Sequence, residues 1–316
     1  MVWFPFVFIT AGVIVGFAKI TGRFLAYVEQ VGSIALIVLM FTIGVNIGIS
    51  DTVITSIGII GLQCVAISIC AITFSVIAVF ALEKTVLPLT ELREKISSKS
   101  INVGSGSSIA NDSSKKISPL VWIIPVCVIA GTVAGLFLPV GFDEMVDNLF
   151  TVSLAVLYTS VGVELAQNRS VFTYIKLLGW KIILVPLGIA IGSVMGGFVV
   201  GVILNIPFHI SVLSAGGMGY YSITGAFMTQ TYSIDVGAYG FLVNVLRDFI
   251  TVLLLPVLIR ISNGAPIAGG ASSNMDTMLM PVTKFVGAEL GLVGLITGTI
   301  LTFAVPVLLP ILMSIV

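Results

Sequence analysis

Long apolar runs, separated by short polar stretches, dominate the pattern of hydrophobic and polar positions along the chain. A helix that crosses a membrane needs about 20 mainly apolar residues. Eight runs meet that requirement, and we expect each to form one span. The runs are residues 3–19, 31–50, 55–82, 119–139, 147–165, 182–204, 238–260 and 285–314. The pattern therefore predicts an all-α membrane protein with about eight transmembrane helices.

Composition supports a membrane location. Of the 316 residues, 58% are hydrophobic and only 9% are charged, whereas soluble domains average about 25% charged residues. The formal net charge is zero, which argues against a nucleic-acid-binding protein. Three cysteines, Cys64, Cys70 and Cys127, lie inside apolar runs without the spacing of metal ligands. We expect them to be apolar packing residues, and we expect neither a metal nor a cofactor.

The basic residues predict the orientation of the spans, because positive charges favour the cytoplasmic side. With the N-terminus outside, the inner loops receive all but one of the 14 lysines and arginines. The charged residues of the outer loops are all acidic. The exception, Arg247, lies inside a span. Residues 3–19 lack the positive leader of a cleaved signal peptide, so we interpret them as a retained span. Both termini are therefore expected outside.

Two further stretches, residues 207–230 and 262–281, are as long as the spans but rich in glycine, serine, alanine and proline. We expect broken or re-entrant segments. Counting the first as a full span would also move Arg260 and Lys284 to the outside. In the predicted topology the first stretch enters from outside and the second from inside, so the two irregular backbones are expected to meet.

Two similar segments predict an internal repeat. Gly12-Val-Ile-Val-Gly16 matches Gly131-Thr-Val-Ala-Gly135, and Phe41–Asn46 resembles Thr159–Glu164 at almost the same offset. Three spans separate the copies, so they point in opposite directions through the membrane. Inverted repeats are typical of secondary transporters. Glycine pairs also recur in membrane helices that pack closely, and the sequence leaves that explanation open.

The repeats predict how the chain is organised. We expect a first membrane repeat of three spans, a flexible cytoplasmic linker, a second and inverted repeat of three spans, and a core with both broken segments and two spans. The linker is rich in charged residues, serine and glycine, which do not bury enough apolar surface to fold. The four parts are residues 1–82, 83–117, 118–204 and 205–316.

Ionisable groups inside a membrane are costly, so each one is a candidate functional residue. Asn244, Arg247, Asp248 and Thr251 recur at intervals of three and four, which places them on one helix face. That face must line a cavity or another helix, although Arg247 and Asp248 could simply neutralise each other or bond to the backbone. Asp276 follows a glycine-rich break and precedes Pro281, where freed carbonyls could meet a cation.

Polar residues in the two broken segments complete the candidate site. Tyr220, Tyr221 and Ser222 lie among glycines and suit a substrate pocket, although tyrosines also favour the membrane interface. Ser273 and Asn274 precede Asp276 directly. The sequence does not assign roles to two further acids near span ends, Glu164 and Glu289. The predicted substrate- and proton-binding residues are Asp248, Asp276, Asn244, Arg247, Tyr220, Tyr221, Ser222, Ser273 and Asn274.

Three motifs resemble one family. The stretches from Ser214 to Gly225, from Asn244 to Ile250, and from Gly269 through Asp276 to Pro281 are similar to the lysine exporter (LysO) family of bacterial inner-membrane proteins. The resemblance implies eight spans with both ends outside. It also implies that two water-accessible acids inside the membrane, at the positions of Asp248 and Asp276, are needed for export.

The resemblance implies L-lysine as substrate and no enzymatic activity. Lysine is cationic, and an inside-negative potential opposes its exit by about 2.3 kcal/mol per charge per 100 mV. Exchange for entering protons is the simplest energy source, since a carboxyl group in a low dielectric can hold either a proton or an ammonium group. The sequence does not decide between a monomer and a homodimer.

Three other functions remain as alternatives. A sodium-coupled transporter or a channel for another solute would also use an aspartate beside a broken helix. An intramembrane aspartyl protease also needs two aspartates, but its Gly-x-Gly-Asp motif is missing at Asp276. Arg247, directly before Asp248, would disturb an acidic pair that shares one proton.

Overall fold

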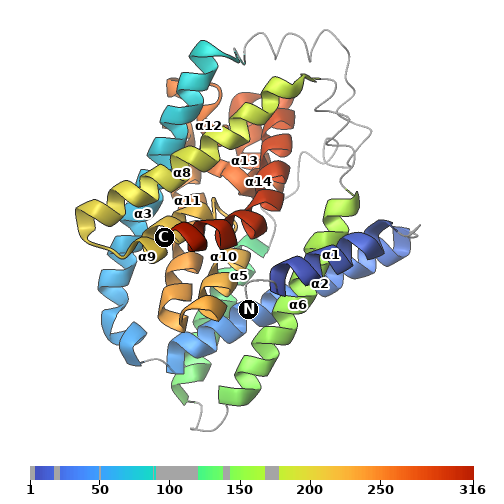
Figure 1. The fold of residues 1–316 in the computed structure, drawn as a ribbon, viewed down its shortest axis with the longest axis vertical. Coiled ribbons are helices and arrows are strands. Elements are labelled where there is room, and N and C mark those ends of the chain that lie inside the picture. The colour runs from blue at the N-terminus through green and yellow to red at the C-terminus, as the bar shows by residue number, and fades with distance from the viewer. Residues whose placement is uncertain are drawn as a thin grey trace. The chain divides into compact units, whose positions relative to one another are not determined.

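The computed structural model describes residues 4–17, 22–49, 51–87, 89, 120–137, 143–167 and 178–316. These residues contain helices and no strand (Figure 1). Most of the predicted linker, residue 88 and residues 90–117, lies outside the described residues. In chain order the helices are α1 (Phe4–Phe17), α2 (Gly22–Ile49), α3 (Asp51–Thr85), α5 (Leu120–Phe137), α6 (Asp143–Gln167), η2 (Trp180–Ile183), α8 (Leu184–Leu204), α9 (Phe208–Gly216), α10 (Tyr221–Thr231), α11 (Ile234–Ile261), α12 (Ala265–Gly270), η3 (Ala271–Met275), α13 (Leu279–Val286) and α14 (Ala288–Ile315).

Apolar helices occur at all eight predicted spans. Four of them, Gly58–Thr85, Trp180–Leu204, Ile234–Ile261 and Ala288–Ile315, are long and apolar enough to cross a membrane. The other four predicted spans contain shorter apolar helices of 10–17 residues within the described part of the chain. The chain is therefore an all-helical, multi-pass membrane protein.

The helices form two compact units, each made of three pieces of the chain. The first unit comprises residues 1–60, 118–169 and 225–239. The second unit comprises residues 61–117, 170–224 and 240–316. Both broken segments contribute to the second unit, although α10 continues from it into the first.

Glycines allow very close helix packing in the first unit. A Cβ atom on Gly12 of α1 would lie 2.1 Å from the Thr159 carbonyl oxygen of α6. A Cβ atom on Gly131 of α5 would lie 2.2 Å from the Phe41 carbonyl oxygen of α2. Both glycines belong to the predicted repeat, and in both pairs the partner helix carries the other repeated motif. The two helix pairs therefore pack through corresponding positions.

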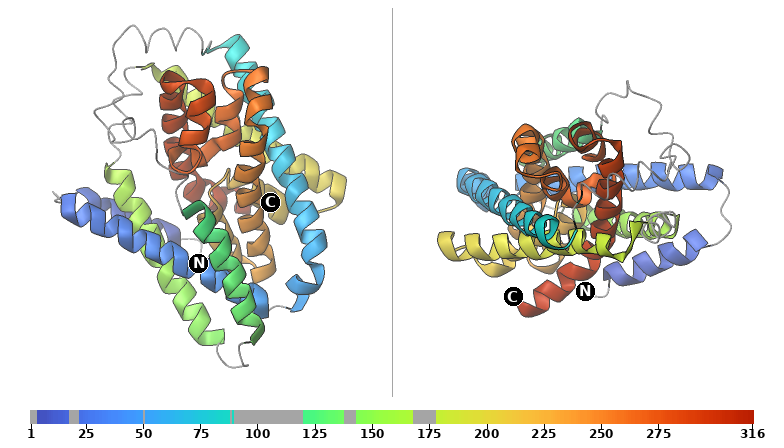
Figure 2. Two further views of the ribbon diagram at one scale, coloured as in Figure 1. Left: turned by 180° about the vertical axis from the view of Figure 1, so that it is seen from behind. Right: turned by 90° about the horizontal axis from the view of Figure 1, so that it is seen from above.

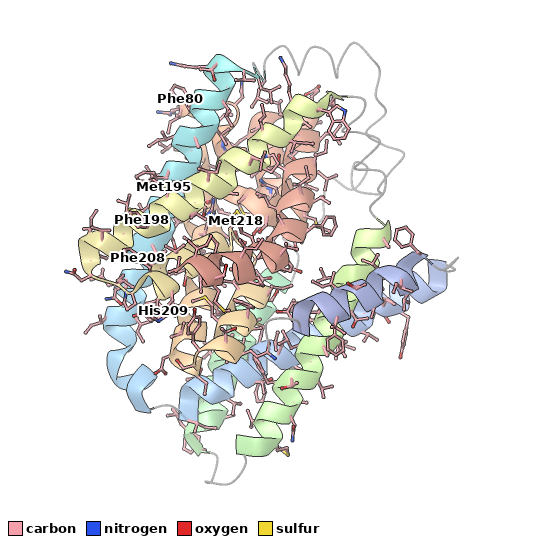
Figure 3. The ribbon with its side chains drawn as sticks, in the orientation of Figure 1. Phe80, Met195, Phe198, Phe208, His209 and Met218 are labelled. Carbon is pink, nitrogen blue, oxygen red and sulfur yellow. The ribbon has the colours of Figure 1, made fainter. Side chains whose placement is uncertain are left out.

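In the second unit, α8 packs against both α3 and α9 (Figure 2). Gly192 of α8 allows the close approach to α3, because a Cβ atom there would lie 2.6 Å from the Phe74 carbonyl oxygen. On α9, Phe208 stacks on Phe198 of α8 with ring centroids 5.0 Å apart (Figure 3). These contacts fix the helices that surround the two broken segments.

Candidate functional site

The first broken segment is interrupted between α9 and α10, as its composition predicts. The turn passes through Met218 with φ of 50° and Gly219 with φ of 97°. Met218 is fully buried inside the second unit (Figure 3). Positive φ values are unfavourable for residues with a side chain, so the turn needs outside support. That support comes from the Met218 carbonyl, which accepts hydrogen bonds from the Ser272 amide at 3.0 Å and the Ser272 hydroxyl at 2.7 Å.

The second broken segment is interrupted between α12 and α13. The chain leaves α12 at Gly270, passes through Ala271 with φ of 45°, and forms the short 3₁₀ helix η3. Asp276 follows η3 directly in a non-helical conformation. Glycine and serine content before Asp276 therefore predicted the break at the right place.

The two interruptions touch each other within the second unit. Besides the two bonds from Ser272, the Ser273 hydroxyl lies 3.2 Å from the Gly219 carbonyl oxygen. Helix α14 packs closely against η3, since a Cβ atom on Gly298 would lie 2.3 Å from the Met275 amide nitrogen. The expectation that both irregular backbones meet is confirmed.

The two candidate aspartates share one neighbour. Asp248, on α11, accepts a hydrogen bond from Ser273 at 2.8 Å on Oδ1 and a longer one from the Thr277 hydroxyl at 3.4 Å on Oδ2. The backbone amide of Thr277 donates to Asp276 Oδ1. Each carboxylate therefore accepts a hydrogen bond from Thr277. Asp276 is exposed in the structure and Asp248 is half-buried.

Asn244 holds the first interruption in place. Its Oδ1 atom accepts the Gly219 amide at 2.7 Å, and its Nδ2 atom donates to the Ser214 carbonyl at 3.0 Å and the Gly240 carbonyl at 2.7 Å. The side chain is 0% exposed. Its polar atoms are therefore occupied by protein groups that shape the turn beside Asp248.

The side chain of Arg247 forms its hydrogen bonds with groups other than Asp248, its neighbour in the sequence. Its side chain is 1% exposed and donates four hydrogen bonds, and no salt bridge with Asp248 occurs among the described residues. The sequence left open whether Arg247 neutralises Asp248 or bonds to the backbone. The structure shows bonds to backbone carbonyls and, in addition, to two hydroxyls. The acceptors are the carbonyls of Ala268 and Gly269 at 3.1 and 3.2 Å, and the hydroxyls of Ser193 and Ser75 at 2.7 and 3.2 Å.

The remaining predicted site residues divide into two groups. Tyr221 is the first residue of α10, directly after the turn, and its ring meets Phe241 edge-on at 6.0 Å. Ser222 follows it in the first turn of α10 and is 3% exposed. Tyr220 is half-buried in the turn itself. Asn274 instead faces α12, where its Nδ2 atom donates to the Ile267 carbonyl at 2.7 Å.

Sequence reasoning missed Thr277, which follows Asp276 directly. Gly219 belongs to the glycine-rich stretch that the sequence indicated as functional, without a role of its own. A Cβ atom on Gly219 would lie 3.2 Å from Asp248 Oδ1. Of the two unassigned acids, Glu289 lies in the first turn of α14, whereas the side chain of Glu164 lies outside the described part.

Metal ligation is not suggested by the site. No group of three or more His, Cys, Asp or Glu residues that could hold a metal ion occurs among the described residues. The chemistry that the arrangement offers is that of two carboxylates beside unwound backbone, which suits the binding of an organic cation or of protons.

Comparison with known proteins points to one family. The chain is 27% identical over 157 residues to the lysine exporter LysO of Escherichia coli, which is 50% of this chain and 52% of that protein, so the match spans about half of the relative's length. A Haemophilus influenzae protein with a provisional lysine-exporter name is 22% identical over 163 residues, 52% of this chain and 82% of that protein. No solved structure matches.

The family model of the lysine exporter LysO matches residues 125–313, which include both interruptions and both aspartates. This range covers more than half of the chain. The protein therefore belongs to the lysine exporter LysO family.

Proposed function

We propose that this protein is a secondary transporter that exports L-lysine across the cytoplasmic membrane in exchange for protons, with Asp248 and Asp276 as the shared binding groups. Membership of the lysine exporter family supports the substrate. The single observation that carries the site is the link through Thr277, which brings the two carboxylates together next to both interrupted helices.

The chemistry of the pair suits an exchange. A carboxyl group in a low dielectric is stabilised either by taking up a proton or by binding a cation. An ammonium group that arrives at the pair therefore favours proton release, and its departure favours proton uptake. Because the two forms compete for the same oxygens, movement of lysine outwards is coupled to movement of protons inwards.

The proposed architecture has eight spans, an inverted repeat and both termini outside. The eight apolar helices at the predicted positions support the span count. Two helix pairs of the first unit pack through corresponding glycines, Gly12 and Gly131, and this supports the repeat. Inverted repeats give a transporter two related access states.

Flux in proteoliposomes tests this function. The full chain is reconstituted, and uptake of radiolabelled lysine is measured with an imposed pH gradient and, separately, with a sodium gradient. We expect the pH gradient alone to drive accumulation, and we expect Asp248→Asn and Asp276→Asn each to abolish it. Asp235→Asn is a matched control, because Asp235 lies in the first turn of the same helix as Asp248.

Three results would contradict the proposal. Accumulation driven by sodium and not by pH would favour the sodium-coupled alternative. Equal flux in wild type and both aspartate variants would remove the acidic pair from the mechanism. Equilibration without accumulation in any gradient would indicate a channel.

A further inference from the structure

Arg247 carries a charge that none of its hydrogen-bond partners balances. Its acceptors are two backbone carbonyls and two serine hydroxyls, which are all neutral. The side chain is 1% exposed, so water screens this charge only weakly. Arginine does not release its proton in proteins. The protein therefore holds one permanent positive charge at the middle of α11.

Two negative groups belong to the same part of the second unit. Asp248 is the next residue of α11, and Asp276 is joined to it through Thr277. Within the described part of this unit, every other Asp, Glu, Lys, Arg or His lies in the first or last turn of a helix. These residues are Glu83, Lys84, Lys181, His209, Arg260, Lys284 and Glu289. Because tyrosines and cysteines are neutral near neutral pH, the charges away from the helix ends are Arg247 and the acidic pair.

These three charges do not cancel. Two ionised carboxylates and one guanidinium leave one negative charge, and a net charge inside a membrane protein is costly. One proton on the pair removes that charge, and so does one bound lysine, which carries one net positive charge near neutral pH. A second proton would leave the charge of Arg247 uncompensated. The empty and the lysine-loaded states are therefore both neutral when a single proton is exchanged.

We infer that Arg247 is the fixed countercharge of the acidic pair: it limits the empty pair to one proton and sets the pH at which lysine displaces that proton. This inference rests on the proposed function. A pair without the countercharge would take up two protons in a medium of low dielectric. Arg247 acts through its electric field, because its donors are occupied by Ser75, Ser193 and the carbonyls of α12.

Wild type tests the number of protons without any variant. Lysine counterflow is measured in proteoliposomes that contain the full chain, with equal pH on both sides, and the half-saturation concentration is followed from neutral to acidic pH. If one proton competes with lysine, this concentration rises about tenfold per pH unit below the midpoint. Two competing protons would give a rise of about a hundredfold per unit, which would overturn the inference.

Arg247→Gln removes the charge and keeps an amide donor. The charged groups of Arg247 and Asp248 start from adjacent residues of one helix and lie on the order of 10 Å apart. At an effective dielectric constant of about 20, losing the positive charge moves the midpoint to higher pH by about one unit. Ser193→Ala is the matched control, because it removes the hydrogen bond at Nη1 and keeps the charge. Its midpoint should equal that of wild type.

A guanidinium with a structural role alone predicts a different result. Displaced helices would raise the half-saturation concentration at every pH and leave the midpoint in place. An unshifted midpoint in Arg247→Gln would therefore overturn the inference, as would an equal shift in Ser193→Ala. If Arg247→Gln does not fold, the wild-type slope decides alone. A wild type that does not transport lysine, or transports it without any pH dependence, would overturn the proposed function and this inference with it.

Discussion

The Ser273 hydroxyl lies 2.8 Å from Asp248 Oδ1 and 3.2 Å from the Gly219 carbonyl oxygen. One short side chain therefore joins the middle of α11 to both interrupted segments. The residue that links the interruptions is thus also a direct partner of the carboxylate, so the backbone geometry and the acidic pair depend on each other.

Ser273→Ala removes the shortest hydrogen bond to the Asp248 carboxylate. We expect the half-saturation concentration for lysine to rise at least about tenfold, because a hydrogen bond to a charged group contributes about 1.5 kcal/mol or more. Ser272→Ala is the control, since Ser272 bonds to the Met218 carbonyl and not to a carboxylate. The prediction is wrong if both variants affect lysine transport to the same degree.

Gly219→Ala places a methyl group in the site. Its Cβ atom would lie 2.6 Å from Ser273 Oγ, and φ of 97° is unfavourable for alanine. We expect transport to fall below about a tenth of wild type, because displacing Asp248 and Ser273 costs more than about 1.4 kcal/mol. Gly294→Ala, where the nearest contact is an ordinary 3.9 Å, should retain transport; comparable losses in both would argue against this account.

Arg247→Met tests the buried guanidinium as a structural link. Losing it leaves four buried acceptors on α3, α8 and α12 without their donor. We expect a loss of at least about 3 kcal/mol of stability, measured by thermal unfolding in detergent. Arg260→Met changes an exposed arginine on the same helix and should leave the melting temperature within about 2 °C. An unchanged melting temperature in Arg247→Met would show that these bonds contribute little.

Gly12→Ala and Gly131→Ala test the paired packing in the first unit. Each Cβ atom would approach a backbone carbonyl oxygen to 2.1 or 2.2 Å, so the helices must separate. We expect each variant to lose about 1–3 kcal/mol of stability. A Cβ atom on Gly58 would meet nothing within 4 Å, so Gly58→Ala should not lower the melting temperature. If only one of the two paired variants is destabilised, the helix pairs are not equivalent.

Much of this arrangement follows from the sequence, because composition controls where a helix breaks. Glycine and serine before Asp276 predicted the second interruption, and an ionisable residue in an apolar run identified Asp248. The prediction that Asn244, Arg247, Asp248 and Thr251 share one inward helix face is correct in part. Asn244, Arg247 and Thr251 are fully buried, whereas Asp248 lies at the edge of that face and is half-buried.

The partners of these residues could not be predicted, since they depend on contacts between distant segments. Arg247 and Asp248 are adjacent, so their side chains leave the helix about 100° apart. The long guanidinium reaches α8 and α12, and the short carboxylate reaches η3 and Thr277. A sequence pattern gives the direction in which each side chain leaves its helix, but not the group that this side chain contacts.

Proton release on lysine binding tests the central claim most directly. Purified protein in weakly buffered detergent solution near neutral pH is mixed with lysine, and the change in pH is followed with an indicator dye. The account predicts that wild type releases protons as lysine binds, and that the Asp248→Asn, Asp276→Asn double variant releases none. Saturable lysine binding by wild type without any proton release would contradict it.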